Sequence, residues 1–199
     1  EWGSDNTTLF FTRVDEAHRP DRLFRTSLGN LGEASLIFEE PDDRFFLGLG
    51  KSQSEEYIFI SLDSAITSEV HIIEASKPTE APKLFAKRRD GIEYNVSHWN
   101  DHFLILTNEN ATNFKLLQTP LDNWDPGAWT EVVVETDDTL QSVLPFKSFF
   151  ALYRRHDGLP EIVLYEPSDA GLQTHVITVD DATWDIWPSA NAMYDTDVF

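Results

Sequence analysis

The run Tyr57-Ile58-Phe59-Ile60 (YIFI) has the composition of a short buried strand, and similar apolar runs recur along the chain. They are LFFT at 9–12, FLIL at 103–106 and FFAL at 149–152. The first residues of successive runs are separated by 48, 46 and 46 positions. A constant period of roughly 40 to 50 residues is typical of β-propeller blades. The repetition therefore predicts a chain built from a series of similar β units.

Each run belongs to a set of four predicted strands. A second strand follows at RLFR (22–25), EVHI (69–72), NFKL (113–116) and EIVL (161–164). Another comes after it at LIF (36–38), KLF (83–85), EVVV (131–134) and HVIT (175–178), and FFL (45–47), IEYNV (92–96) and LQSV (140–143) precede three of the pairs. Four strands per repeat is the composition of one blade.

The strand pattern predicts an all-β fold, a partial β-propeller of about four four-stranded antiparallel blades. The predicted blades cover approximately 1–40, 41–90, 91–136 and 137–180, and TWDIW at 183–187 starts a further blade over 181–199. Residues 67–89 carry Pro78 and Pro82, which disfavour a helix, so they read as strand, loop, strand. Because the pattern starts inside one blade and stops inside another, we expect a piece of a larger ring.

The composition of the chain limits the classes of molecule that it could bind. With 35 acidic and 15 basic residues the formal charge is −20, which disfavours binding to nucleic acid or to anionic membranes. Two interpretations of this charge stay open: an electrostatic funnel for cationic peptides, or an acidic surface that maintains solubility. The chain has no cysteine, lacks a signal-like N-terminus and has no apolar run of spanning length, so we expect a cytoplasmic protein.

Motifs for covalent or nucleotide chemistry are not found in the sequence. An α/β-hydrolase places its serine in a Gly-x-Ser-x-Gly turn, and no such turn occurs. Gly50-Lys51-Ser52 resembles the end of a phosphate-binding loop, but Phe45 stands where that motif needs glycine. We therefore expect no catalytic and no cofactor-binding residues in this chain.

Two patterns have the residue types of metal sites. His98 and His102 flank Asp101, a spacing that binds metal on a helix, but here it spans a turn between strands. The acidic pairs Asp42-Asp43, Asp137-Asp138 and Asp180-Asp181 lack the alternating loop of a calcium site. Surface histidines at a hairpin and solvated turn residues are the favoured interpretations, so no metal site is expected.

Basic pairs and tryptophans are the remaining candidates for binding. Arg88-Arg89 and Arg154-Arg155 either clamp a carboxylate of a ligand or partner, or pair with neighbouring acids of this chain. Trp124 and Trp129 either form a platform for a sugar or pack down on the sheet. In both cases we favour the second, structural alternative.

Three long segments resemble one family of serine peptidases. They are RRDGIEYNVSHWNDHFLILTNENATNFKLL (88–117), TRVDEAHRPDRLFRTSLG (12–29) and DDRFFLGLGKSQSEEYIFISLDSAITSEV (42–70). Together they look like the propeller of the oligopeptidase B branch of the prolyl oligopeptidase family, and the likeness extends over essentially the whole chain.

The resemblance implies a two-domain enzyme whose seven-bladed propeller caps a catalytic α/β-hydrolase domain. Such an enzyme cleaves short peptides after Lys or Arg, typically in the cytoplasm, and needs no cofactor. This chain would then be a non-catalytic segment, inactive alone, that limits access of basic peptides to the catalytic domain. A propeller-like module that binds proteins or sugars is the alternative, and a metal-dependent enzyme is a third reading. Open sheet edges also predict self-association of the isolated segment.

Overall fold

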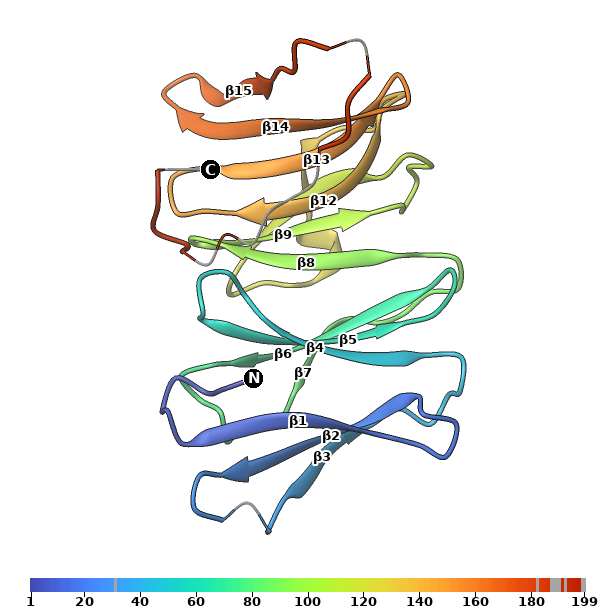
Figure 1. Cartoon of the computed structure of the whole chain (residues 1–199), viewed down its shortest axis with the longest axis vertical. Helices are drawn as coiled ribbons and strands as arrows, with labels where there is room; N and C mark the ends of the chain where they lie inside the picture. The colour runs from blue at the N-terminus through green and yellow to red at the C-terminus, as the bar shows by residue number, and fades with distance from the viewer. Residues whose placement is uncertain (31, 182, 187–190, 192, 198–199) are drawn as a thin grey trace. The chain divides into compact units, whose positions relative to one another are not determined.

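The chain folds as two compact units, which are described separately. The computed structural model describes all residues except 31, 182, 187–190, 192 and 198–199 (Figure 1). The units comprise Glu1–Tyr94 and Asn95–Phe199. Every strand pair with an assigned register is antiparallel, and the described residues contain a single 3₁₀ helix, η1, at Pro126–Ala128.

The first unit contains a three-stranded and a four-stranded sheet. The first sheet has the order β1 (Thr8–Val14), β2 (Pro20–Ser27) and β3 (Ser35–Glu39). The second has the order β4 (Phe46–Lys51), β5 (Tyr57–Asp63), β6 (Ser68–Glu74) and β7 (Lys83–Ala86). Alternate residues of β5, namely Ile58, Ile60 and Leu62, are completely buried and pack with Phe10 and Leu23 of the first sheet. One apolar core therefore joins the two sheets.

The second unit repeats this design with two four-stranded sheets. The third sheet has the order β11 (Thr130–Val133), β10 (Lys115–Pro120), β9 (His102–Thr107) and β8, which begins at Tyr94 and ends at Trp99. The fourth has the order β12 (Thr139–Pro145), β13 (Phe150–His156), β14 (Leu159–Ser168) and β15 (Gly171–Ile177). Large side chains from both sheets, among them Trp99, Leu116, Phe150 and Tyr165, form their shared core.

The predicted fold class is confirmed. Four successive antiparallel sheets follow one another along the chain, as expected for a partial β-propeller. The first sheet has three strands because the residues before Leu9 contribute only an isolated bridge from Trp2 to that residue. The predicted strand, loop, strand at 67–89 is also correct, since β6 and β7 flank an irregular segment that contains Pro78 and Pro82.

Three predicted strands begin two residues late or are not formed. The strand predicted at 113–116 begins at Lys115, because Phe114 donates its N–H to the carbonyl of Ala111 at 3.1 Å in a turn. The strand predicted at 92–96 begins two residues later, because Ile92 closes a turn by donating its N–H to the carbonyl of Arg89 at 3.0 Å. The strand predicted at 183–187 is not formed at 183–186, and residue 187 lies outside the described residues. Instead of pairing with a strand, Trp184 donates its indole N–H to the carbonyl of Pro160 at 2.7 Å, and Ile186 packs on the apolar face of the fourth sheet.

Candidate functional site

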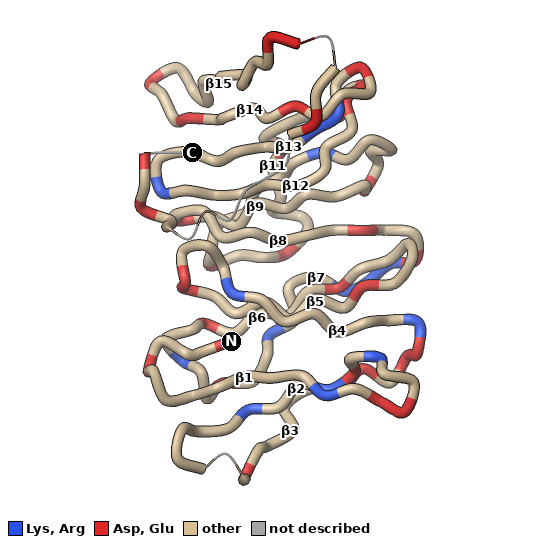
Figure 2. The backbone as a smooth tube through the Cα atoms, viewed as in Figure 1, with Lys and Arg blue, Asp and Glu red and all other residues tan. Residues whose placement is uncertain are grey.

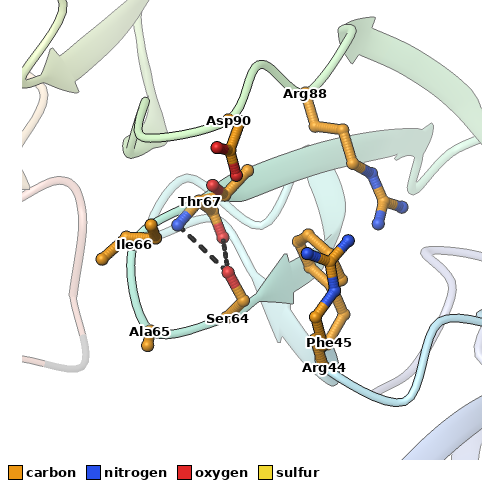
Figure 3. Close-up of a pocket in the computed structure, with 8 residues that line it drawn as sticks. All are labelled: Arg44, Phe45, Ser64, Ala65, Ile66, Thr67, Arg88 and Asp90. Carbon is orange, nitrogen blue, oxygen red and sulfur yellow. Dashed lines mark hydrogen bonds between the residues drawn. The ribbon is translucent and has the colours of Figure 1, made fainter.

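The candidate site is a pocket at one end of the second sheet. Three connections meet there: residues 40–45 before β4, the β5–β6 turn at 64–67 and residues 87–93 after β7. They lie at the same end because β4 begins where the antiparallel β5 and β7 finish. The cavity measures about 440 Å³. Its lining residues, drawn in Figure 3, are Arg44, Phe45, Ser64, Ala65, Ile66, Thr67, Arg88 and Asp90.

Phe45 forms an aromatic wall of the pocket beneath two guanidinium groups. Its side chain is only 3% exposed. The guanidinium carbon of Arg88 lies 4.0 Å from the centre of the ring, and that of Arg44 lies 5.9 Å away. Both distances are in the range in which a cation is attracted to the face of an aromatic ring. The wall therefore combines apolar surface with positive charge.

Arg88 is held in place by two buried carboxylates. Its Nη2 donates to Glu40 and to Glu69, the latter at 3.0 Å, and its backbone N–H donates to the second oxygen of Glu69 at 2.9 Å. Burial alone would lower the pKa of Arg88, but the hydrogen bonds to Glu69 and Glu40 outweigh it and raise the pKa. Burial likewise opposes ionisation of Glu69, yet the bonds from His71 and Arg88 lower its pKa to about 2. Arg88 and Glu69 are therefore both charged at neutral pH.

A second arginine fixes the loop that carries Phe45. Nη1 of Arg19 donates to the carbonyl oxygens of Glu40, Asp42 and Phe45, at 3.3, 3.0 and 2.8 Å. Nε of Arg19 donates to Asp15 at 3.0 Å, which orients the guanidinium. Such bonds from a cation satisfy the backbone carbonyl groups of a loop that does not pair with a strand. These hydrogen bonds from Arg19 hold residues 40–45 in place.

The rim of the pocket is more exposed than its wall. The side chain of Arg44 is 71% exposed and donates through Nε and Nη2 to the two oxygens of Asp42, at 3.0 and 2.7 Å. This pair lowers the pKa of Asp42 to about 2. Ile66 is 55% exposed at the tip of a turn closed by Ser64, whose hydroxyl donates to the carbonyl of Thr67 at 3.0 Å. The rim thus presents a guanidinium and an aliphatic side chain.

This pocket is suited to binding rather than to covalent chemistry. Its eight lining residues include no histidine and no cysteine, and the Ser64 hydroxyl is occupied in its own turn. A serine nucleophile needs a neighbouring base and donors for the developing oxyanion. Charged residues of both signs gather in the turns at this end of the first unit (Figure 2). The arrangement offers contacts for an apolar group and for charged groups.

The basic pairs follow the structural interpretation. Arg88 pairs with acids of its own chain, as described above. Arg154 does the same, with Nε donating to Glu161 at 2.7 Å and Nη1 lying 3.0 Å from Asp138. Arg155 donates to the carbonyl of Gly158 at 3.0 Å across the β13–β14 turn. Arg88, Arg154 and Arg155 thus all contact groups of their own chain.

We predicted that His98 and His102 both lie at the surface, and this is confirmed for His102 but wrong for His98. His102 is part-exposed and lies 2.7 Å from Asp101 through its Nδ1. His98, predicted at the surface, is only 1% exposed and meets Phe103 edge-on at 5.8 Å between ring centres. The reason is the alternation of β8, in which Tyr94, Val96 and His98 point to the buried face.

The other candidates take structural roles in the described residues. Ser52 of the loop-like Gly50-Lys51-Ser52 run accepts the backbone N–H of Tyr57 at 3.0 Å in the β4–β5 hairpin. Asp138 pairs with Arg154, and residues 180 and 181 follow β15 without regular structure. In the part of the chain that the structure describes, no three His, Asp or Glu side chains gather as a metal would require. None of the described helices has the length and apolarity that crossing a bilayer requires.

Trp124 packs against the third sheet, and Trp129 is bonded to the loop that carries Trp124. Trp124 donates its indole N–H to the carbonyl of Leu121 at 2.6 Å and meets Phe103 edge-on at 5.8 Å. Trp129 donates to the carbonyl of Trp124 at 3.1 Å. Both side chains are half-buried in the β10–β11 connection. They stabilise this long loop, in agreement with the favoured interpretation.

Comparisons with known proteins identify close relatives. A family model described as the N-terminal β-propeller domain of prolyl oligopeptidase matches residues 1–199. The chain is 40% identical over 198 residues to Protease 2 from Moraxella lacunata, covering 98% of this chain and 28% of the relative. It is 29% identical over 200 residues to dipeptidyl aminopeptidase BI from Pseudoxanthomonas mexicana, covering 98% and 27%.

Solved structures share the fold. Oligopeptidase B from Trypanosoma brucei with covalently bound antipain, in its closed form, superposes with a TM-score of 0.88 at 23% identity, over 98% of this chain and 29% of that one. Oligopeptidase B from Leishmania major gives 0.81 at 27% identity, over 90% and 27%. The chain thus spans less than a third of the length of the relatives that it matches.

Proposed function

The chain belongs to the prolyl oligopeptidase family, as part of its N-terminal β-propeller domain, and we propose that it is the non-catalytic segment of a serine oligopeptidase that cleaves short peptides after Lys or Arg. The observation that carries the proposal is the match of all 199 residues to the propeller together with 40% identity to Protease 2. The resemblance to this family predicted from the sequence is confirmed.

The proposed role is to control access to a catalytic hydrolase domain of the same polypeptide, in the cytoplasm. Two observations support a role without chemistry. The sequence has no nucleophile elbow, and the arginines of the candidate pocket are engaged by Glu40, Glu69 and Asp42 rather than by a nucleophile. In this proposal the serine, its base and the oxyanion donors lie in the hydrolase domain.

The charge of the chain supports a preference for basic peptides. A formal charge of −20 raises the local concentration of cationic ligands and speeds their capture. Cleavage after Lys or Arg matches this bias, because such peptides carry at least one positive charge. The propeller would then both concentrate basic peptides and restrict those that are too large to enter.

The proposal is tested on the native product isolated from source cells with antibodies against this chain. A fluorophosphonate probe, which reacts with activated serines, should label a band much heavier than 22.8 kDa. The labelled protein should cleave short peptides with Arg or Lys at the cleavage site and leave matched peptides with Pro there intact. It should also lose activity as the peptide is lengthened. A labelled product that prefers Pro would overturn the proposed specificity.

The alternative function is a propeller module that binds proteins or sugars without hydrolase activity. The observation that supports this alternative is the candidate pocket, which offers contacts for binding and contains no nucleophile. It predicts a native product that the fluorophosphonate leaves unlabelled while control hydrolases in the same lysate are labelled. That outcome would replace the peptidase proposal.

A further inference from the structure

The second unit contains a small cleft between β8 of the third sheet and β12 of the fourth. It measures about 110 Å³, and the described residues that line it include no acidic or basic side chain. Its apolar floor is formed by buried leucines of β9 and β10, namely Leu104, Leu106 and Leu116. Its polar lining residues are Asn95, Ser97, Gln141 and Ser142. The cleft therefore combines an apolar floor with neutral polar walls.

On β8, two polar residues interrupt an apolar face. Residues two apart on a strand face the same side, so Asn95 and Ser97 share the face of Trp99. Trp99 packs in the core that the third and fourth sheets share, together with Leu104 and Leu106 of the neighbouring β9. Asn95 is exposed and Ser97 is half-buried, so this part of the face stays open to a ligand. Breaks of a local pattern are expected at functional sites.

On β12, a β-bulge brings Gln141 to the cleft. Leu140 and Val143 both pack in the core shared with the third sheet, although strand alternation would place residues three apart on opposite faces. The register of β12 against β13 shifts between Leu140 and Ser142, which makes Gln141 the extra residue of a bulge. Bulges re-aim side chains and are over-represented next to active sites. The backbone of β12 is therefore shaped to present Gln141.

The polar groups of the cleft are free to bond a ligand. In the part of the chain that the structure describes, the side chains of Asn95, Ser97 and Gln141 form no hydrogen bond with protein groups. A carboxamide carries an acceptor oxygen and two N–H donors, and a hydroxyl both donates and accepts. The matching ligand is a neutral group that donates and accepts at once, on a short aliphatic stem that can lie on the leucines.

From these observations we propose that the cleft binds the carboxamide side chain of an Asn or Gln residue in a peptide. The ligand carboxamide donates to and accepts from Asn95 and Gln141, and its methylene groups lie on Leu104 and Leu116. Pockets for drug-sized ligands measure about 300–1,000 Å³, so a cleft of about 110 Å³ accommodates one side chain rather than a longer segment. A charged side chain is disfavoured, because no lining group would pair with it.

In a peptidase, the cleft contributes to the selection of peptide substrates by their content of Asn or Gln. This role rests on the proposed function, because it needs a peptide substrate, whereas recognition of a carboxamide does not. Its new content is a preference for carboxamide side chains, in addition to cleavage after Lys or Arg.

Peptide binding to the full-length protein tests the recognition. The probes are acetyl-Gly-Gln-Gly-N-methylamide and acetyl-Gly-Met-Gly-N-methylamide, in which a thioether replaces a carboxamide of nearly the same shape. Neither contains Lys or Arg, and the reactive serine is first blocked with the fluorophosphonate. Saturation-transfer NMR should give a dissociation constant about fivefold lower for the Gln peptide, because only its side chain bonds the polar walls. Equal dissociation constants for the two peptides would overturn the proposal.

Substitutions in the full-length protein locate the contact. Gln141→Met removes the carboxamide of β12 and nearly keeps its shape, and Asn95→Leu removes that of β8, so each should largely abolish the preference for the Gln peptide. Gln173→Met is the matched control, because Gln173 is exposed on β15 at the opposite edge of the same sheet. The Met peptide should bind all variants alike, which shows that the fold is retained. A preference that survives both cleft substitutions would place the recognition elsewhere and refute the proposal.

The two proposals fail in different ways. If the native product carries no fluorophosphonate-reactive serine, the proposed function fails, and the same titrations on the untreated protein decide whether the cleft binds a carboxamide. If the serine is labelled but the two peptides bind equally, the peptidase proposal stands and the carboxamide site is wrong.

Discussion

The guanidinium of Arg88 bonds the carboxylate of Glu40, a residue 48 positions earlier in the chain, and so ties the first sheet to the second. Glu40 is 3% exposed. Arg88→Met should therefore leave the buried Glu40 carboxylate without an ion pair, and Glu69 with His71 as its remaining side-chain partner. We expect a loss of about 3 kcal/mol in the free energy of unfolding, the low end for a broken buried pair because Arg88 is 26% exposed. Urea denaturation followed by fluorescence measures it.

The neighbouring Arg44 is the control for this prediction. It lies over the same ring and also pairs with a carboxylate, but its side chain is largely in solvent. Arg44→Met should cost clearly less than Arg88→Met, because exposed ion pairs contribute little to stability. Equal losses for the two variants would contradict the view that burial of Glu40 and Glu69 makes Arg88 important.

Glu69 predicts how the stability of the first unit depends on pH. Its pKa is lowered from 4.5 to about 2 in the folded chain, because the bonds from His71 and Arg88 outweigh burial. A depressed pKa contributes stability above pH 4.5, and this contribution is lost as the pH falls from 4.5 towards 2. Glu69→Gln should flatten the pH dependence of the unfolding free energy in this window by up to about one proton. An unchanged slope would show that other carboxylates determine acid unfolding.

Most of the fold was predictable from sequence because the strands are short, apolar and periodic. The runs that contain Ile58, Leu104 and Ala151 all became central strands of their sheets. Strand boundaries were less predictable, since Ile92 has the apolarity of a strand but forms a turn. Burial of His98 had a readable signal, because extending the alternation of Tyr94 and Val96 by two residues places it on the buried face.

The candidate pocket was only partly predictable. The sequence indicated that Arg88 pairs with acids of its own chain, but not which ones. Glu40 and Glu69 are 48 and 19 positions away, and their meeting depends on how two sheets pack and on the β-bulge where β6 pairs with β7, between Val70 and His71. Neither feature follows from spacing along the chain. The cation–π contact with Phe45 depends on the same packing.

The core of the second unit depends on Phe150. Its ring is completely buried, stacks on Tyr165 at 4.9 Å and meets Trp99 edge-on at 5.0 Å. Phe150→Ala should lower the free energy of unfolding by about 3–5 kcal/mol, because the transfer energy is lost and a cavity remains. Leu172→Ala, at an exposed position of the same sheet, should cost about 0.5 kcal/mol or less. Thermal or urea denaturation measures the loss of unfolding free energy in both variants. If Phe150→Ala lost no more than Leu172→Ala, Phe150 would not be central to this core.

His156 should titrate above its ordinary range. A hydrogen bond from its Nδ1 to Asp138, at 2.7 Å, and the charge of that carboxylate raise the pKa of His156. The stabilising contribution is complete below pH 6.5 and is lost as the pH rises through the folded pKa. In NMR titrations of the ring protons, Asp138→Asn should lower the pKa of His156 clearly. Asp157→Asn, which removes a carboxylate 3.8 Å away, should lower it less, and the reverse order would reject the assigned pair.

If the proposed function is correct, the charge of the chain predicts a salt-dependent rate of substrate capture in the full-length protein. With 20 more acidic than basic residues, long-range attraction should raise kcat/KM for a peptide with an Arg-Arg pair when salt is low. The Debye length falls from about 30 Å at 0.01 M to about 10 Å at 0.1 M salt, so kcat/KM should fall severalfold over this range. A matched peptide with a single Arg between neutral residues should show a weaker dependence, because attraction grows with ligand charge. If both peptides were captured at rates independent of ionic strength, the acidic surface would serve solubility and not substrate steering.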